Sequence, residues 1–209
     1  MKILSNQNRV VLSGRIYSDV RYSHSIKTEK LYSFDLSVTR ESGIEDIIPV
    51  VFSDRTVSPV FEKGDWVCLS GSYRSRNRMD GDISKSNHIL EVFATNISES
   101  VENRNFNRIE LDGYICKSPL YRVTPLGREI CDILVAVNRG NRKIDYIPLI
   151  TWGGNASFSS KLEVGSFIEV SGRIQSRPYS KYIEDSGVGG HYESRIAYEV
   201  SCSWIGQIQ

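Results

Sequence analysis

The sequence predicts a mainly β protein built from two tandem five-stranded barrels, each with one short helix. Three features lead to this prediction: an internal repeat, an alternation of apolar and polar residues, and glycines inside the expected strands. The repeat shows as NRVVLSGRI at residues 8–16 and NRIELDGYI at residues 107–115, which lie 99 positions apart. The same offset pairs single residues farther along the chain: Tyr22 with Tyr121, Asp46 with Asp145, and Pro49 with Pro148.

Two domains of similar length follow from the repeat. A chain of 209 residues lies between one large domain and two small ones, and each copy has the size of one small domain. The offset grows to 101 between residues 63–76 and 164–177, so insertions lie in the loops around that segment. The polar stretch SESVENRNFN at residues 98–107 is typical of a linker. We therefore expect domain 1 at residues 1–103 and domain 2 at residues 104–209.

The strands of each copy are indicated by a period of two residues. Apolar side chains at alternate positions are Tyr32, Phe34, Leu36 and Val38 in the first copy and Cys131, Ile133, Val135 and Val137 in the second. Such alternation is typical of half-buried strands. Four glycines fall inside the expected strands: Gly14, Gly71, Gly113 and Gly172. Glycine at such positions indicates bulges or tight bends, which a closed sheet needs.

A short helix is expected before the fourth strand of each copy. The candidate segments are residues 57–63 and 155–162, followed by the turn glycines Gly64 and Gly165. Five strands with one helix between the third and the fourth form the outline of an OB-fold barrel. A small β-sandwich is the structural alternative, and the hydrophobic pattern alone does not decide between the two.

Composition limits the classes of function. The formal net charge of +1 excludes a protein whose whole surface attracts nucleic acid, so any such binding must use a local patch. No apolar run is long enough to span a bilayer and MKILSNQNR has no signal-peptide core, so we expect a cytoplasmic protein without membrane contact. The four cysteines form no C-x-x-C pair, and no motif joins the three histidines to a nucleophile. We expect no cofactor, no metal and no enzymatic activity.

Several segments, taken in order, resemble a known family. In the first copy these are NRVVLSGRI, FDLSVTR, DIIPVVFSD and KGDWVCLSGSYRSR. In the second copy they are NRIELDGYI, SPLYRVTPLGREICDILVAVNR, DYIPLITWG and LEVGSFIEVSGRIQSRPY. Both sets resemble bacterial single-stranded DNA-binding proteins, so the chain is similar to the tandem two-domain form of that family. The resemblance implies four OB folds in a homodimer and sequence-independent binding of single-stranded DNA in replication, recombination or repair.

The resemblance also implies which side chains stack on bases. The family's aromatic positions fall on Tyr146, Trp152 and Tyr179 in the second copy, whereas the first copy has Ile47, Ser53 and Arg78 there. A further stacking tryptophan of the family falls on Ser42 and Asn141 and is absent from both copies. Alternation along a strand places Tyr146, Pro148, Ile150 and Trp152 on one face. The alternative is that this face packs against a neighbouring subunit or that Trp152 belongs to the core.

Cations that could contact phosphates are found in both copies. They are Arg139, Arg142, Lys143, Arg173, Arg177 and Lys181 in the second copy and Arg74, Arg76 and Arg78 in the first. A solvated surface is the alternative for any one of them. Our hypothesis is that domain 2 stacks bases, whereas domain 1 contributes phosphate contacts, oligomer contacts or both.

Two features of the sequence depart from the family pattern, and two other functions are possible alternatives. Pro49 and Pro148 stand where the family usually has a polar residue, and a proline inside a strand indicates an edge or a bulge. The chain also ends soon after its last expected strand, without the family's acidic tail for recruiting replication proteins. The rivals are an OB-fold module that holds a protein partner, similar to primosomal proteins, and RNA binding, since a stacking groove discriminates poorly between nucleic acids.

Overall fold

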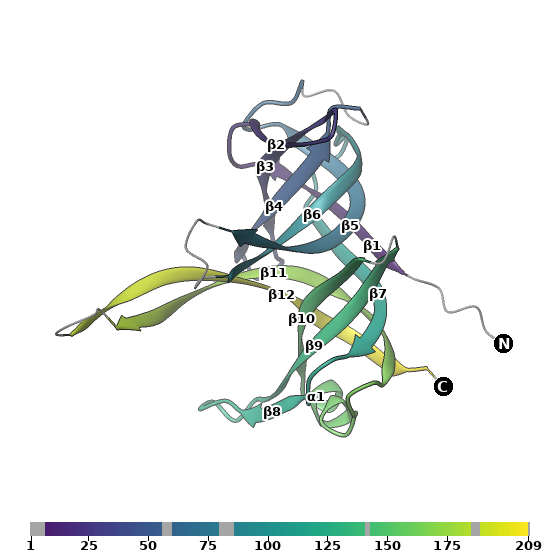
Figure 1. Cartoon of the computed structure of the whole chain (residues 1–209), viewed down its shortest axis with the longest axis vertical. Helices are drawn as coiled ribbons and strands as arrows, with labels where there is room; N and C mark the ends of the chain where they lie inside the picture. Colours follow the sequence, from purple (N-terminus) through teal and green to yellow (C-terminus); the bar gives the residue numbers. More distant parts are fainter. Residues whose placement is uncertain (1–6, 56–59, 80–85, 141–142, 185–188, 209) are drawn as a thin grey trace.

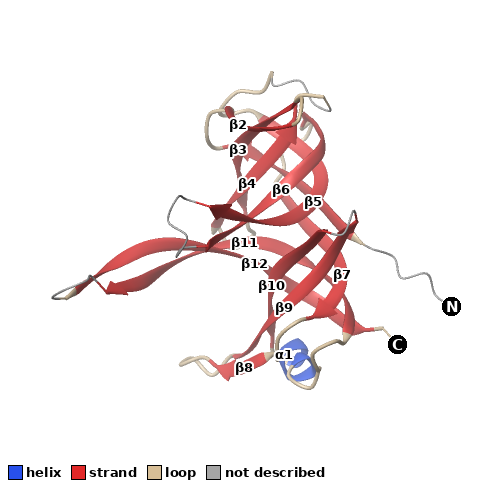
Figure 2. Ribbon diagram, viewed as in Figure 1, coloured by secondary structure: helices blue, strands red, loops and turns tan. Residues whose placement is uncertain are grey.

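The computed structural model describes residues 7–55, 60–79, 86–140, 143–184 and 189–208. Within these ranges, the side chains of residues 77–79, 86–88 and 184 lie outside the description. Almost all of the regular structure is strand, as Figure 2 shows. The expectation of a mainly β protein is therefore confirmed.

Six strands form the first barrel region: β1 (Asn8–Ile16), β2 (Arg21–Ile26), β3 (Glu29–Thr39), β4 (Glu45–Ser53), β5 (Trp66–Met79) and β6 (Ser86–Glu99). Five of them close a ring in the order β1-β3-β4-β6-β5-β1, because β1 pairs with both β3 and β5. The β4–β6 pair is parallel and the other pairs of the ring are antiparallel. This ring is a five-stranded barrel of the OB type.

The second barrel repeats this plan. Its strands are β7 (Phe106–Ile115), β8 (Leu120–Val123), β9 (Glu129–Gly140), β10 (Lys143–Trp152), β11 (Phe167–Glu184) and β12 (Gly190–Gln207). The ring runs β7-β9-β10-β12-β11-β7, again with one parallel pair, β10–β12. Strands β2 and β8, which sequence analysis did not predict, each add a short hairpin partner outside the ring.

The strand glycines have the predicted purpose. The register shifts at Ser70/Gly71 and at Ser171/Gly172, which marks a bulge in β5 and in β11. A Cβ atom on Gly14 would lie 2.2 Å from the carbonyl oxygen of Ser37. Because β1 turns from β5 to β3 at this point, the backbone must approach its neighbour too closely for any side chain.

The expected helices are found in one copy. Helix α1 (Gly154–Ser159) precedes β11 and buries Ala156 and Ser159, although it ends before the expected residue 162. The described residues 60–65 of the first copy contain no helix, and part of the expected segment, residues 56–59, lies outside the description. Pro59 gives a physical reason, since proline offers no amide and disfavours helix at the residue before it.

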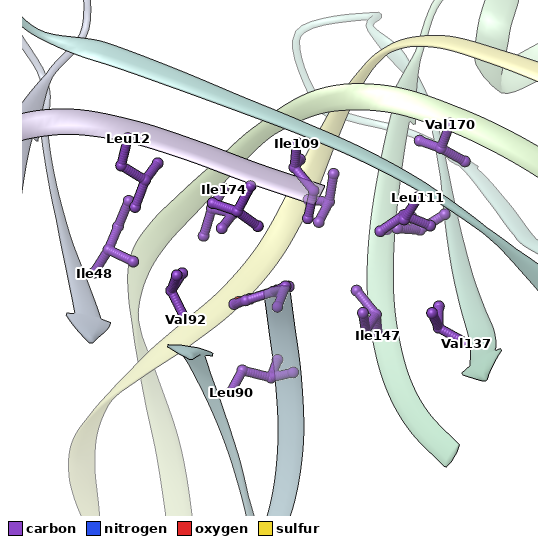
Figure 3. Packing of buried hydrophobic residues seen from close by; sticks show 14 of the residues in the cluster. Leu12, Ile48, Leu90, Val92, Ile109, Leu111, Val137, Ile147, Val170 and Ile174 are labelled. Atoms are coloured by element: carbon purple, nitrogen blue, oxygen red, sulfur yellow. The ribbon is translucent and has the colours of Figure 1, made fainter. Parts of the chain in front are cut away.

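The two barrels are joined by a strand pair. β1 and β7 run antiparallel, and Val10 pairs with Ile109, its own counterpart in the repeat. A pseudo-twofold axis therefore passes through this pair. One cluster of buried apolar residues crosses it, with Leu12 and Ile48 from the first barrel and Leu111 and Ile147 from the second (Figure 3).

Each barrel also sends a hairpin across the other. The hairpin β5–β6 reaches β10, and β11–β12 reaches β4 and then extends well beyond both barrels (Figure 1). The outer part of this hairpin is formed by residues 178–184 of β11 and residues 190–194 of β12. No helix in the described ranges has the length and apolar character needed to cross a membrane.

Candidate nucleic-acid interface

Strand β10 presents two aromatic side chains on its outer face. Tyr146 and Trp152 are 41% and 39% exposed, whereas Ile147 and Leu149 are buried in the barrel. Trp152 lies six residue steps beyond Tyr146 along the strand, which corresponds to about 20 Å. Within this chain Trp152 is thus a surface residue, and the alternative that it belongs to the core is wrong.

The repeated proline occupies an edge position in both copies. Pro148 pairs with Leu134 of β9, and the parallel pairing of β10 with β12 begins one residue later, at Leu149. Pro49 pairs with Asp35, and β4 likewise joins β6 from Val50. A missing amide costs no ladder hydrogen bond at such a place. The expectation of an edge is confirmed.

The outer face of β10 continues onto β12 and β11. Ile150 pairs with Ser201, and Ser201 pairs with Arg173. Residues at two-residue steps along a strand share a face. The face of Arg173 therefore also holds Gln175, Arg177, Tyr179 and Lys181, opposite Glu199, Ala197, Arg195 and Glu193 of β12. We call this side of β10, β12 and β11, which carries the exposed Tyr146, Trp152 and Tyr179, the aromatic face. Between these rings it also holds four residues of low exposure: Ile150, Gln175, Glu199 and Ser201.

The third aromatic stands where the long hairpin leaves the barrel. Tyr179 is 37% exposed and pairs with Arg195, whose guanidinium donates hydrogen bonds to Glu193. Hydrogen bonding to Glu193 is the main reason why the pKa of Arg195 lies above its usual value. Farther out, the rings of Tyr182 and Tyr192 meet edge to face at 5.2 Å. These two tyrosines lie on the opposite face of the hairpin from Tyr179.

Two predicted cations are each paired with a glutamate of low exposure. Nε of Arg177 lies 3.7 Å from Glu199, and Nε of Arg76 lies 2.9 Å from Glu91. The two pairs are related by the pseudo-twofold axis. Both arginine side chains remain about half exposed, at 41% for Arg76 and 54% for Arg177.

Arg139 and Arg74 are placed mainly by contacts between the barrels. Arg139 is paired through two nitrogens with the fully buried Asp145 and donates to the carbonyl of Ser75 over 2.9 Å. Arg74 lies 3.7 Å above the ring of Phe93, and burial, together with nearby Arg139, lowers its pKa. Their proximity and burial indicate a structural position for both.

The remaining predicted cations are more exposed or undescribed. Lys143 and Lys181 are exposed, and across the described ranges neither has a carboxylate partner. Arg142 lies outside the described residues, and so does the side chain of Arg78. Arg173 lies within β11, just after the bulge at Gly172, and lines a pocket between the barrels.

A cation beside Trp152 was not expected from the sequence. An open depression of about 560 Å³ is lined by Trp152 and by the turn between β8 and β9, including Arg128. The turn belongs to the segment LGREICD, which was read only as part of the family resemblance. Pairing of β8 with β9 brings Arg128 to this place, and no local pattern announces such a pairing.

The corresponding positions of the first barrel carry no exposed aromatic ring. Ile47 is half-buried and Ser53 is 1% exposed. The aromatic face thus belongs to the second barrel.

Among the described residues, no group of three His, Cys, Asp or Glu side chains could hold a metal ion.

Comparison with known proteins gives a match in this same part of the chain. Residues 106–200 match the model of the Single-strand binding protein family. Over 80 residues the chain is 36% identical to the Single-stranded DNA-binding protein of Clostridium tetani and 38% identical to Single-stranded DNA-binding protein A of Bacillus subtilis. These alignments cover 35% of this chain and 55% and 46% of the relatives, so the chain spans about half the length of the curated relatives it matches.

The solved structures extend the likeness to both barrels. The wild-type single-stranded DNA binding protein from Thermus aquaticus superposes with a TM-score of 0.76 over 97% of this chain and 93% of that chain, at 20% identity. A deletion mutant of the same protein gives a TM-score of 0.73 at 21% identity. The expected architecture of two tandem OB-fold barrels is confirmed.

Proposed function

We propose that this protein binds single-stranded DNA without regard to sequence, by stacking bases on Tyr146, Trp152 and Tyr179. One observation carries the proposal: three exposed rings lie on the same side of β10 and β11, in the barrel whose residues match the Single-strand binding protein family. The relatives with 36% and 38% identity are named for binding single-stranded DNA. Each stacked base contributes about 1 to 3 kcal/mol, whatever its identity.

Phosphate contacts come from the cations around the aromatic face. Lys143, Arg177 and Lys181 are exposed on β10 and β11, and Arg128 adjoins Trp152. Arg76 contributes from the first barrel, with its outer side free of Glu91. Protein cations that contact the phosphates displace the salt cations condensed on the DNA strand. The affinity for the strand therefore falls as the salt concentration rises.

The two barrels divide the work. The first barrel, residues 1–103, supports the aromatic face through the contacts of β5 with β10 and through the joined β1–β7 pair, and the second, residues 104–209, stacks the bases. Two such chains assemble into a homodimer with four OB folds, acting in replication, recombination or repair in the cytoplasm.

A fluorescence titration tests the proposal. Oligothymidine is unstructured, and a base stacked on Trp152 quenches its emission. We expect strong quenching and an affinity that falls as salt rises. Absence of binding at low salt would refute the proposal and leave a protein-partner module as the better function. Oligouridine of equal length, titrated in parallel, measures the preference for DNA over RNA.

A further inference from the structure

A pocket of about 380 Å³ lies between the two barrels, away from the three stacking side chains. Its walls are the end of β3 with the following turn (residues 38–42), Asp46, residues 105–107 at the start of β7, and Arg173 of β11. The backbone amide of Thr39 donates to Oδ1 of Asn105 over 3.0 Å, which ties the inter-barrel segment to the first barrel. Both barrels are therefore needed to form this pocket.

Arg173 brings an incompletely satisfied cation to the pocket. Its Nε is buried and has no hydrogen-bond partner within the described part of the chain, and its Nη2 has a long contact of 3.4 Å to Gln175. Burial, and then the nearby charge of Arg40, lower the pKa of Arg173. An anion in the pocket would supply both the missing acceptor and the opposite charge.

The other charges of the pocket leave room for such an anion. Nε and Nη2 of Arg40 donate to the two oxygens of Asp46 over 2.7 and 2.6 Å, so these two charges largely offset each other. Glu41 is the second carboxylate of the lining and is exposed to solvent. It opposes an anion from the rim, where water screens its charge.

An aromatic ring stands in the same pocket. Phe106 is 41% exposed at the start of β7. Its neighbour Asn107 is held in place, because its side chain donates to the carbonyl of Ile174 and accepts from the amide of Ile174. A ring for a base beside a guanidinium for a phosphate is the combination that binds one nucleotide of a single strand.

The pocket lies on the same face of β11 as Tyr179, because Arg173, Arg177 and Tyr179 are separated by even numbers of residues. Gln175, between Arg173 and Arg177, is 6% exposed, so a strand that continues inward from Tyr179 would pass over it to reach the pocket. We propose that the pocket is a further nucleotide subsite, with a phosphate on Arg173 and its base on Phe106. This inference rests on the proposed binding of single-stranded DNA.

The test compares pocket variants in the oligothymidine titration. Arg173→Gln should reduce the slope of log affinity against log salt by about 0.7, the value for one phosphate contact on a single strand. Phe106→Ser should weaken binding of long oligothymidine at least about fivefold, whereas Phe106→Tyr keeps the ring and the affinity. In both weakened variants the maximal quenching of tryptophan should persist, because Trp152 is unchanged. Lys161→Gln removes an exposed charge outside the pocket and should leave the slope as it is.

A variant that binds more tightly than the parent serves as a further test, because misfolding cannot explain a gain of affinity. Glu41→Gln removes the carboxylate at the rim and should raise the affinity. The inference is overturned if Arg173→Gln, Phe106→Ser and Glu41→Gln all bind with the parent's affinity and salt slope. If the unmodified protein shows neither quenching nor binding, the proposed function fails and the subsite fails with it. If the unmodified protein binds but the three variants do not differ from it, only the subsite fails.

Discussion

The carboxylate of Asp145, in the second barrel, accepts a hydrogen bond of 2.6 Å from the backbone amide of Ser75, in the first. The hydroxyl of Ser75 in turn accepts from the amide of Tyr146 over 2.9 Å. The related contacts on the other side of the pseudo-twofold axis are Asp46 with the amide of Ser176, at 2.8 Å, and Ser176 with the amide of Ile47, at 3.0 Å. Asp46 and Asp145 thus each hold one barrel to the other, which gives a structural reason for the aspartate in both copies of the repeat.

Replacing Asp145 by asparagine should both destabilise the protein and weaken DNA binding. Asp145 is fully buried and paired with the partly exposed Arg139, and breaking a buried pair costs up to about 3 to 5 kcal/mol. The contact also fixes the start of β10 at Tyr146. We expect a lower unfolding midpoint in urea and a several-fold lower affinity for oligothymidine at a temperature where the variant is folded.

The matched control is Asp46→Asn. Asp46 has the equivalent pair with Arg40, but Ile47 follows it in place of a stacking aromatic. Its loss of stability should therefore be similar, and binding of an oligothymidine too short to reach the pocket that Asp46 lines should weaken less. Equal losses of affinity in the two variants would show that Asp145 acts through stability alone.

Removing the stacking rings should reduce affinity in steps. Tyr146→Ala, Trp152→Ala and Tyr179→Ala should each cost about 1 to 3 kcal/mol of binding free energy, with little change in stability, because all three are exposed. Fluorescence anisotropy of a labelled oligothymidine measures the loss, since it does not depend on Trp152.

An exposed tyrosine of the first barrel serves as the control for the rings. Tyr22 is 57% exposed on β2, outside the aromatic face, so Tyr22→Ala should bind as the parent does. If the triple variant of Tyr146, Trp152 and Tyr179 still bound oligothymidine with the parent's affinity, stacking on this face would be refuted.

Much of the fold could be predicted from the sequence, because the signal is local. The period of two indicates which face of β3 or β9 is buried, and the repeat gives two copies of the same strand pattern, one for each barrel. Strands β2 and β8 were missed for the opposite reason: every residue of β8 is exposed, so it has no apolar alternation. Its pairing with β9 depends on distant residues.

The candidate site was less predictable, because its charges are set by contacts between the barrels. Arg139 is one of the cations that could contact phosphates, which stays a prediction. Its guanidinium is paired with Asp145 and reaches the carbonyl of Ser75, some 70 positions earlier in the chain than Asp145. Whether Arg173, Arg177 and Lys181 contact phosphates stays a prediction. Alternation along one strand predicted that Tyr146 and Trp152 share a face, but it could not predict their exposure, since Ile150 on that face is 5% exposed.

Tyr73→Phe should raise the stability of the protein. Tyr73 is fully buried in the first barrel, and its hydroxyl has no hydrogen-bond partner among the residues that the structure describes. Burial is also the main reason why the pKa of Tyr73 lies well above its usual value. Leaving a buried polar group unpaired costs about 1 to 3 kcal/mol, so its removal should raise the urea midpoint. A lower midpoint would mean that the hydroxyl has a partner, such as a bound water.

Gly172→Ala should be strongly destabilising although it adds one methyl group. A Cβ atom there would lie 2.3 Å from the carbonyl oxygen of Ser201, at the bulge that lets β11 bend around the barrel. Relieving the clash must move β12 away from β11, and overpacking of this kind costs about 1 to 3 kcal/mol or more.

Gly154→Ala is the control, because the added Cβ meets nothing within 4 Å at the first residue of α1 and alanine favours helix. Thermal unfolding of the two variants separates a requirement for space at Gly172 from a general effect of replacing glycine. Equal midpoints would show that β11 and β12 can separate at the bulge without loss of packing.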